Sequence, residues 1–427
     1  MKITVSKRTM VAILALVTVT GNSKSQNSFI WGKQFGSEKD DYVLNQVIDT
    51  NGNLFVAGKT TGIIETKNFG KNDGFLTKID SSGNIIWAKQ FGTPEEEDEQ
   101  WCAIDKSGNV YITGTTTGDL NGKNAGMEDI FIVKYNTDGK ILWSKQFGTA
   151  GKDIAKGIYA DNNGNIYVTG ATAGKLGQAS FGKNDCFIMK LDDSGNQIFT
   201  RQFGTPEDDY CYFIAGGQGS DILVCGTTWG SLSGKNKGVI DGFTGQFTDK
   251  GDLIKYNQIG SEGFDIPMVL KMDNEKNIYV GGSTSGNFGG NQQGEGDAFL
   301  LKLNDKGDIL WNNQFGTKNN DGVRAISFNP DISDNLLVSG IMNLPPAQGF
   351  IRMYKNDGSM LWERCFFGSG ETNLCSGKDV NFDNKGNFYH LGLTGTNLFG
   401  NLTGIHNYYI VKYRLDDAYR KHQSNWK

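Results

Sequence analysis

The chain carries acidic side chains at a fixed interval, and this spacing raises the question of ion or ligand binding. A glycine recurs every 56 residues from Gly36 to Gly316, and an acidic residue lies five positions after each one. These residues are Asp41, Glu97, Asp153, Asp209, Asp265 and Asp321, with Asn373 in the last repeat. A collar of carboxylates could attract cations, basic peptides or amino sugars. It could instead accept N–H bonds from neighbouring turns, and its occurrence in nearly every repeat favours this structural interpretation.

Residues that depart from the repeat are better candidates for a specific site, because a real site should break the symmetry. Trp229 replaces the Thr, Ser or Ala found at that place in most other repeats. Its ring could stack on a sugar or pack on a neighbouring side chain. His406, Tyr408 and Tyr409 lie in the last repeat, beside a shortened loop at 340–350. We expect the notch and these three residues to form an asymmetric pocket.

Nucleophilic and metal-dependent chemistry find little support in the sequence. Only three histidines occur, at 390, 406 and 422, and there is no H-E-x-x-H, P-loop or dinucleotide fingerprint. His390 stands where the other repeats have Val or Ile, so we expect a buried core histidine. The run EEEDE at 95–99 indicates a solvated loop, or a patch for calcium or a basic partner. We predict no metal or other cofactor, while carboxylate-pair or Tyr–His chemistry on glycans stays open.

The elements that position these residues repeat with the same period of 56. Within each repeat, apolar residues alternate with period two, which predicts β-strands. One strand ends in glycine, as in GNVYITG at 108–114, and the next reads DIFIVKY at 129–135. The turn NTDG then leads into KILWSKQFG at 140–148. With a strand before them, these segments predict a four-stranded antiparallel meander in each repeat.

Seven such sheets can bury their faces by packing around an axis, which predicts an all-β fold, a seven-bladed β-propeller. The seventh repeat stops after its third strand, near residue 413, without a closing WxxQFG. The segment FIWGKQFG at 29–36 has the sequence of that missing strand. We therefore predict that the N-terminal strand completes the C-terminal blade and closes the ring, which would cover an open sheet edge.

The first 25 residues are typical of an export signal. Lys2, Lys7 and Arg8 precede the apolar stretch 10–20, and SKS at 23–25 suits a signal peptidase. We expect an exported monomer with one domain at 26–427 and no membrane span. A net charge of −5 without a basic run argues against nucleic acid as a partner.

The six cysteines share no repeat position or metal-ligand spacing. Cys211 with Cys225, or Cys365 with Cys375, could form a disulfide, and neither pairing is compelling from the sequence.

The recurring segments GNxYVTGxTxG, GKNDxFIxK and DxxGxxxWxKQFG resemble those of the bacterial seven-bladed β-propeller repeat family, abbreviated SBBP. The resemblance covers essentially the whole chain after the leader. It implies exported, often surface-associated bacterial proteins without a shared catalytic set. The DGKILW segment is also similar to quinoprotein repeats, but no quinone-binding constellation is recognisable. We therefore expect a binding or scaffold module for a glycan or protein partner at the loop-rich mouth. A polysaccharide lyase or glycosidase is the alternative.

Overall fold

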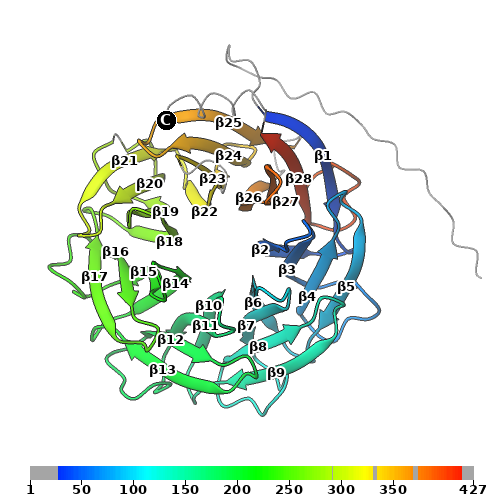
Figure 1. The fold of residues 1–427 in the computed structure, drawn as a ribbon, viewed down its shortest axis with the longest axis horizontal. Helices are drawn as coiled ribbons and strands as arrows, with labels where there is room; N and C mark the ends of the chain where they lie inside the picture. The colour runs from blue at the N-terminus through cyan, green and yellow to red at the C-terminus, as the bar shows by residue number, and fades with distance from the viewer. Residues whose placement is uncertain (1–26, 291, 330–333, 369–373, 416–427) are drawn as a thin grey trace, which may run out of the picture.

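The computed structural model describes residues 27–290, 292–329, 334–368 and 374–415, and these residues form strands β1 to β28. The strands make seven four-stranded antiparallel sheets, arranged as blades in a ring around a central axis (Figure 1). The predicted seven-bladed β-propeller is therefore confirmed. Within the described residues there is no helix, and so none that could cross a membrane. The expected export signal at 1–25 lies outside them.

Each blade runs from an innermost strand at the axis to an outermost strand at the rim (Figure 1). Blade one contains β2 (Asp41–Ile48), β3 (Leu54–Thr60), β4 (Asp73–Ile79) and β5 (Ile85–Phe91). Blade two contains β6 (Glu97–Ile104), β7 (Val110–Thr116), β8 (Asp129–Tyr135) and β9 (Ile141–Phe147). Blade three contains β10 (Asp153–Ala160), β11 (Ile166–Thr172), β12 (Asp185–Leu191) and β13 (Gln197–Phe203). Blade four contains β14 (Asp209–Gly216), β15 (Ile222–Thr228), β16 (Asp241–Phe247) and β17 (Leu253–Ile259).

The remaining blades follow the same order. Blade five contains β18 (Asp265–Met272), β19 (Ile278–Thr284), β20 (Asp297–Leu303) and β21 (Ile309–Phe315). Blade six contains β22 (Gly322–Phe328), β23 (Asn335–Met342), β24 (Gln348–Lys355) and β25 (Met360–Phe366). Blade seven contains β26 (Cys375–Phe382), β27 (Asn387–Thr394) and β28 (Asn407–Leu415) from the end of the chain and β1 (Asn27–Phe35) from its beginning.

The hydrophobic core lies between neighbouring blades, because each sheet has two apolar faces. All seven residues of β7 and all seven of β8 are buried. Phe55 and Leu76 of blade one pack in the same cluster as Ile112 and Phe131 of blade two. Burying one such side chain contributes roughly 1.5–3 kcal/mol. The blades are therefore held mainly by contact with each other.

β1 pairs with β28, which places residues from opposite ends of the chain side by side. The register runs from Asn27 opposite Leu415 to Phe35 opposite Tyr408. Phe35 stacks on Tyr408 with ring centroids 5.4 Å apart. Trp31 meets Tyr389 edge-on at 6.1 Å. The outermost strand of blade seven is thus packed through aromatic rings as well as backbone bonds.

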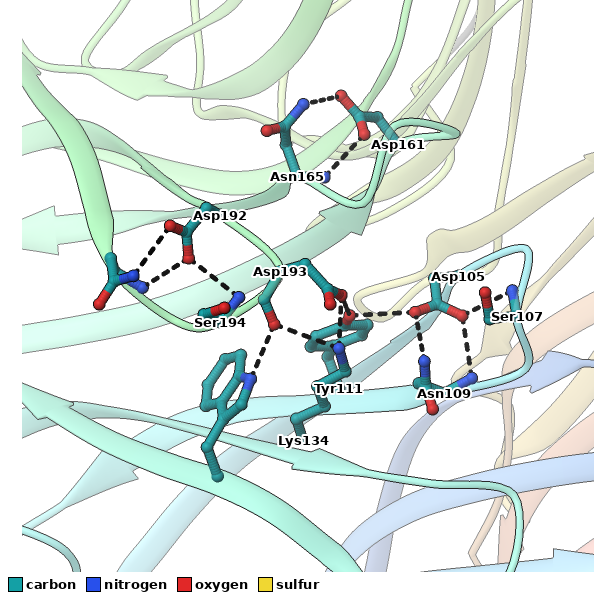
Figure 2. Close-up of polar contacts among 12 residues, drawn as sticks. Asp105, Ser107, Asn109, Tyr111, Lys134, Asp161, Asn165, Asp192, Asp193 and Ser194 are labelled. Atoms are coloured by element: carbon teal, nitrogen blue, oxygen red, sulfur yellow. Dashed lines mark hydrogen bonds and ion pairs between the residues drawn. The ribbon is translucent and has the colours of Figure 1, made fainter.

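The two ends of the ring carry different connections. We call the end with the long loops and the blade-to-blade connections the mouth face, and the end with the tight hairpins the hairpin face. In one hairpin, the carboxylate of Asp105 accepts N–H bonds from Ser107 and Asn109 at 2.8 and 2.9 Å (Figure 2). Asp161 and Asp192 form the same kind of turn. The repeated D-x-x-G-N sequence is therefore a turn-forming motif.

A polar cluster on the hairpin face joins neighbouring blades. Lys134 of β8 forms an ion pair with Asp193 of the next blade, and the Tyr111 hydroxyl lies 3.0 Å from the same carboxylate (Figure 2). Trp143 donates from Nε1 to the backbone oxygen of Asp193 at 2.9 Å. The same tryptophan bond recurs between other blades, from Trp31 to Ser81, Trp87 to Thr137 and Trp311 to Asn356. This recurrence marks the cluster as structural.

Each innermost strand contains a β-bulge at a corresponding place. In β10 the pairing shifts between Ala155 and Gly157, which leaves Lys156 outside the ladder. Equivalent shifts leave out Leu44, Glu99 with Gln100, Tyr212, Met268, Arg324 and Lys378. A bulged residue has no partner in the ladder, and bulges commonly re-aim a side chain. The chemistry at these positions differs from blade to blade, in contrast to the uniform second and third strands.

Candidate functional site

The periodic carboxylates at the mouth are buried. Asp41, Asp153, Asp209, Asp265 and Asp321 are at most 2% exposed. Each accepts bonds from the backbone N–H and the hydroxyl of the residue four positions earlier. In blade four these donors belong to Thr205, at 2.5 and 2.9 Å. The carboxylates therefore hold the blade-to-blade connections in place, which favours the structural interpretation of these residues.

The last repeat departs from this arrangement. Asn373 lies outside the described residues, and Cys375 takes the place of the carboxylate by pairing with Thr394 across the ladder.

The glutamine of the repeated KQFG segment has a similar structural role. Gln90 donates to the Asp73 carboxylate at 2.7 Å and to the backbone oxygen of Gly62 at 3.0 Å. It also accepts the N–H of Ile64 at 2.7 Å. The same carboxylate contact joins Gln146 to Asp129, Gln202 to Asp185, Gln258 to Asp241 and Gln314 to Asp297. Much of the repeat sequence is thus explained by bonds that hold loops.

Trp229 lies on the mouth face and remains 37% exposed. Its ring meets Tyr210 edge-on, with centroids 5.8 Å apart. Tyr210 in turn stacks on Tyr212 at 6.5 Å, with 9° between the ring planes. We call Trp229, Tyr210 and Tyr212 the aromatic wall. It extends along blade four from a mouth loop to the bulge of β14, so Trp229 both packs on a neighbour and keeps an accessible surface.

Tyr408 and Tyr409 are not accessible from the mouth. They are 1% and 0% exposed, because neighbouring blades cover both faces of β28. Tyr408 stacks on Phe75 with centroids 5.8 Å apart, and Tyr409 packs against Phe366 at 5.6 Å. The notch expected beside the loop at 340–350 therefore does not bring these two rings to a ligand.

His406 joins two loops at the mouth. Its Nδ1 lies 2.7 Å from Oδ1 of Asp40, in the connection between β1 and β2. Glu128 and Lys152 form an ion pair at the corresponding place between blades two and three, with 2.7 Å between nitrogen and oxygen. Because the repeat uses this place for loop-to-loop contacts, the His406–Asp40 pair has a structural explanation.

The acidic run at 95–99 divides into parts with different surroundings, because β6 begins within it. Glu95 pairs with Lys71 at the surface, 2.8 Å apart. Glu97 is buried against the Thr93 N–H and hydroxyl. Asp98 and Glu99 lie on the innermost strand, and Glu99 has a φ of 58° at the bulge. The predicted loop is therefore wrong for the last three residues, which lie on β6, although the Asp98 side chain remains 43% exposed. A positive φ is unfavourable for glutamate, and it sits beside charged groups at the axis.

Five charged or polar side chains meet at the axis, and the sequence pattern did not predict them as a group. We call Tyr42, Glu99, Lys156, Arg324 and Lys378, which come from five different blades, the axial cluster. Lys156 Nζ lies 2.7 Å from Oε1 of Glu99, and Lys378 Nζ donates to the Tyr42 hydroxyl at 2.6 Å. The charge of Glu99 acts on Arg324 although blades two and six are not neighbours. These side chains therefore face one another across the axis.

Further along the innermost strands, toward the hairpin face, larger side chains close the axis. Trp101 of blade two meets Phe213 of blade four edge-on at 6.2 Å. Gly157 lies between them in blade three, where an added Cβ would be 3.3 Å from Phe213 Cα. Lys271 Nζ lies 5.9 Å from the Phe213 ring centroid, and its charge acts on Asp379. We call these residues the axial floor. They lie further along the innermost strands than the axial cluster, on its side toward the hairpin face.

Burial and neighbouring charges shift the acid–base properties of the axis. The pKa of Lys378 is lowered to about 7, because burial strips water from the ammonium and the positive charge of Arg324 opposes it. Burial also raises the pKa of Asp379 to about 6 and raises the pKa of Tyr42. Arg324 is exposed to solvent, and none of the described residues pairs with its guanidinium. The axis therefore holds a lysine that titrates near neutral pH beside an unpaired cation.

A signal for the axial cluster was present in the sequence. Lys156 and Arg324 each lie three residues after a periodic carboxylate, and Lys378 lies three residues after Cys375. Comparing this one position across the repeats shows that its chemistry changes, whereas the carboxylate itself is constant. The sequence does not show that this position faces the axis, because that orientation depends on the bulge in the innermost strand.

Neither disulfides nor a metal site occur among the candidate residues. All six cysteines are free thiols, so neither of the two pairings forms. Over the described part of the chain, no group of three or more His, Cys, Asp and Glu side chains is placed to hold a metal ion.

A groove of about 890 Å³ lies among the mouth loops of blades four and five, away from the axial cluster. Its lining includes Lys235, Lys237, Glu262 and Gln292, all on loops. Side chains on strands are positioned more precisely than side chains on loops. We therefore place the candidate site at the axial cluster and the aromatic wall.

Fold and site define a seven-bladed β-propeller with a polar, asymmetric axis. Three segments of the chain, residues 30–65, 103–121 and 142–177, match the sequence model of the SBBP beta-propeller repeat. This confirms the resemblance expected from the sequence.

Curated relatives match only part of the chain. The regulatory protein FlaEY of Caulobacter vibrioides is 27% identical over 175 residues, which cover 37% of this chain and 18% of the relative. An uncharacterised protein of Aquifex aeolicus is 25% identical over 195 residues, covering 46% of this chain and 50% of the relative. Each match spans half of the relative's length or less.

Two solved structures are similar to this chain at low sequence identity. An ulvan lyase, described as a polysaccharide lyase, is 12% identical with a TM-score of 0.49, covering 90% of this chain and 96% of its own. A Hadza microbial sialidase is 9% identical with a TM-score of 0.46, covering 88% and 65%. At these identities and TM-scores the likeness says nothing about the chemistry of this chain.

Proposed function

We propose that this chain is an exported binding module that holds a glycan at the mouth-face end of its axis. The axial cluster supports this role, because it departs from the repeat at positions the scaffold does not use. The periodic aspartates and glutamines, and the tryptophans Trp31, Trp87, Trp143 and Trp311, make hydrogen bonds that hold loops or blades together. The bulged side chains have no part in the ladder, yet they bring two lysines, a carboxylate and an unpaired guanidinium into one place.

The dimensions of the axis favour a slender ligand. Side chains from blades two and six interact across it, and Trp101 and Phe213 close it below. A folded partner could insert only a loop or a side chain there, whereas a glycan chain end fits the shape. The aromatic wall on blade four offers flat rings for a sugar, which is a common use of tyrosine and tryptophan in polar sites.

Binding to a glycan and peptide array, followed by calorimetry on the best ligands, tests this function. We expect saccharide ligands whose affinity falls when Trp229 or Tyr210 is changed to Ala, with the melting temperature little altered for the exposed Trp229. Ile254→Ala is a matched control, because Ile254 is a large exposed side chain on the rim strand β17. If only peptides bind, or if saccharide binding ignores the wall variants, the glycan function is wrong.

A carbohydrate-active enzyme is the second candidate, and the Lys378–Tyr42 contact is the observation in its favour. A lysine with a pKa near 7 can accept a proton at neutral pH, and a tyrosine hydroxyl 2.6 Å away can pass one on. Incubating the bound glycans with wild type and Lys378→Met, and following chain length by mass spectrometry, separates the two functions. Shortening by the wild type alone would establish the enzyme, and unchanged chains would leave the binding module.

A further inference from the structure

The charged groups of the axial cluster are unequally paired. Lys156 is paired with Glu99 at 2.7 Å, and Lys378 donates to Tyr42 at 2.6 Å. Arg324 has no hydrogen-bond or ion-pair partner in the described part of the chain. The cluster thus contains three cationic side chains and one carboxylate, and that carboxylate is already engaged. A positive excess is left at the axis of a chain whose net charge is −5.

The surroundings of this excess charge favour a bound anion. The axial floor lies beneath the cluster, and the low dielectric of a recessed site strengthens electrostatic interactions. A guanidinium offers two parallel N–H groups that match the oxygens of a carboxylate or sulfate. The Lys378 ammonium and the Tyr42 hydroxyl come from the two blades that follow Arg324 around the ring, so they can add further donors to the same anion.

The aromatic wall lies on a different blade from these donors. Tyr212 occupies the bulge of β14, the position that Arg324 occupies in β22 and Lys378 in β26. Blade four is separated from blade six by one blade and from blade seven by two. A ligand at the axis therefore meets cationic groups on one side and aromatic rings on the other.

We propose that the axial cluster binds the carboxylate or sulfate group of an acidic oligosaccharide, with Arg324 as the anchoring cation and the aromatic wall against the sugar rings. This inference rests on the proposed glycan-binding function and adds its ligand class. The two sources of the anion, a uronate and a sulfated sugar, share the chemistry that Arg324 recognises. A short acidic peptide supplies carboxylates without sugar rings and is an outcome of the test.

Calorimetry with four probes tests the proposal: an oligogalacturonate, a sulfated heparin-type oligosaccharide, the neutral cellotetraose and a poly-glutamate peptide. We expect at least one of the two acidic saccharides to bind more tightly than cellotetraose and the peptide. Arg324→Gln should weaken that binding by about tenfold or more, the loss expected for charge-assisted hydrogen bonds. Arg324→Lys should restore part of it. Arg414→Gln removes an exposed arginine of the third strand β28 and is the matched control.

The outcomes separate the ligand class from the function itself. If cellotetraose binds as well as the acidic saccharides and Arg324→Gln binds normally, the anionic class is wrong and glycan binding stands. If the peptide binds through Arg324 while both acidic saccharides fail, or if no saccharide binds, the proposal is overturned together with glycan binding. Thermal unfolding of each variant shows that the fold is retained, which we expect because Arg324 is exposed and outside the ladder.

Discussion

The Lys378 ammonium donates a hydrogen bond of 2.6 Å to the Tyr42 hydroxyl and lies 4.2 Å from the centroid of the same ring. The two residues are far apart in the chain, on the innermost strands of blades seven and one. Their contact places a buried cation next to Arg324, on blade six. Acid–base behaviour at the axis is therefore set across the junction between the first and last blades.

We expect the affinity for an acidic oligosaccharide to fall as pH rises from 6 to 8. The pKa of Lys378 is about 7, so the ammonium that favours an anion is present below this pH and lost above it. The charged or titratable groups facing Lys378 are Tyr42, Arg324 and Glu99, and a bound anion should raise its pKa. Calorimetry at several pH values measures the slope. Lys378→Met should flatten it, while Lys145→Met on the rim strand β9 should keep it.

His390 should make the protein acid-sensitive. As the sequence predicted, it is buried, and its Nε2 lies 3.0 Å from the Ser339 hydroxyl. Burial lowers its pKa from the ordinary 6.5 to about 3, so the unfolded chain binds a proton that the folded chain does not between these values. This group's contribution to stability is full above pH 6.5 and is lost as pH falls toward 3, at about 1.4 kcal/mol per pH unit.

Urea denaturation of His390→Val between pH 3 and 8 measures this effect as a difference from wild type. Valine is the residue most other blades have at this place. The variant should gain stability relative to wild type only below pH 6.5, after a constant offset for the lost Ser339 contact. Ser339→Ala is the control, because it removes the partner and keeps the imidazole. Parallel curves for wild type and His390→Val would contradict the prediction.

Gly195 should tolerate alanine less well than Gly219 does. Both have positive φ, 78° and 67°, so backbone strain costs each variant about 1–2 kcal/mol. An added Cβ at Gly195 would lie 3.1 Å from Trp143, whereas nothing lies within 4 Å at Gly219. The Trp143 ring is held by its bond to Asp193, so we expect a further 1–3 kcal/mol or so at Gly195. Equal losses in urea denaturation would show that the ring moves aside.

Removing residues 26–36 should unfold the protein or drive it to associate. The deletion strips the partner from β28 and leaves a row of unpaired backbone groups. It also removes Trp31 and Phe35, each contributing roughly 1.5–3 kcal/mol if fully buried. Whole-domain stability is only about 5–15 kcal/mol. Light scattering and thermal unfolding report the result, with a chain ending at Arg420 as the control. A monomer with an unaltered melting curve would mean that the ring closes in another way.

Dialysis against EDTA should leave the melting temperature unchanged. The carboxylates of Asp41, Asp209 and their counterparts accept N–H and hydroxyl bonds from their own loops, so we expect the loops to keep their structure without an ion. A loss of several degrees that calcium restores would instead assign ion binding to these residues.

The fold was predictable because the residues that recur in the repeat are those whose side chains form the hydrogen bonds that hold its loops. Asp209 must accept its own loop N–H and Gln90 must hold a loop, so these residues recur at 56-residue intervals and reveal the blades. Burial of the third strand was harder to predict. Beside His406 in the sequence, Tyr408 and Tyr409 look like surface aromatics. Neighbouring blades cover both faces of β28, so consecutive side chains are buried although they point to opposite faces of the sheet.

The axial cluster could not be predicted from alternation alone. A bulge shifts the side chains after it to the other face of the strand, and period-two patterns do not show where the shift occurs. Lys378 is harder still to recognise from the sequence. The last glycine interval is 52 residues instead of 56, so Lys378 does not align with its counterparts when the repeats are compared at a fixed spacing. The interaction of Glu99 with Arg324 depends on ring closure, which brings residues 225 positions apart in the sequence to opposite sides of one axis.

Each of the seven innermost strands has one bulge, at a corresponding place in its blade. The bulges therefore give the ring seven positions whose side chains can vary independently of the repeat. A substitution there alters the inner surface and leaves in place the backbone ladder and the hydrogen bonds that hold the mouth loops. Leu44 and Met268 occupy two of these positions with apolar side chains. Replacing them with charged or aromatic residues would change which ligands the axis binds. Libraries of variants at these positions could therefore select new binding specificities on one scaffold, as variable loops do on an antibody framework.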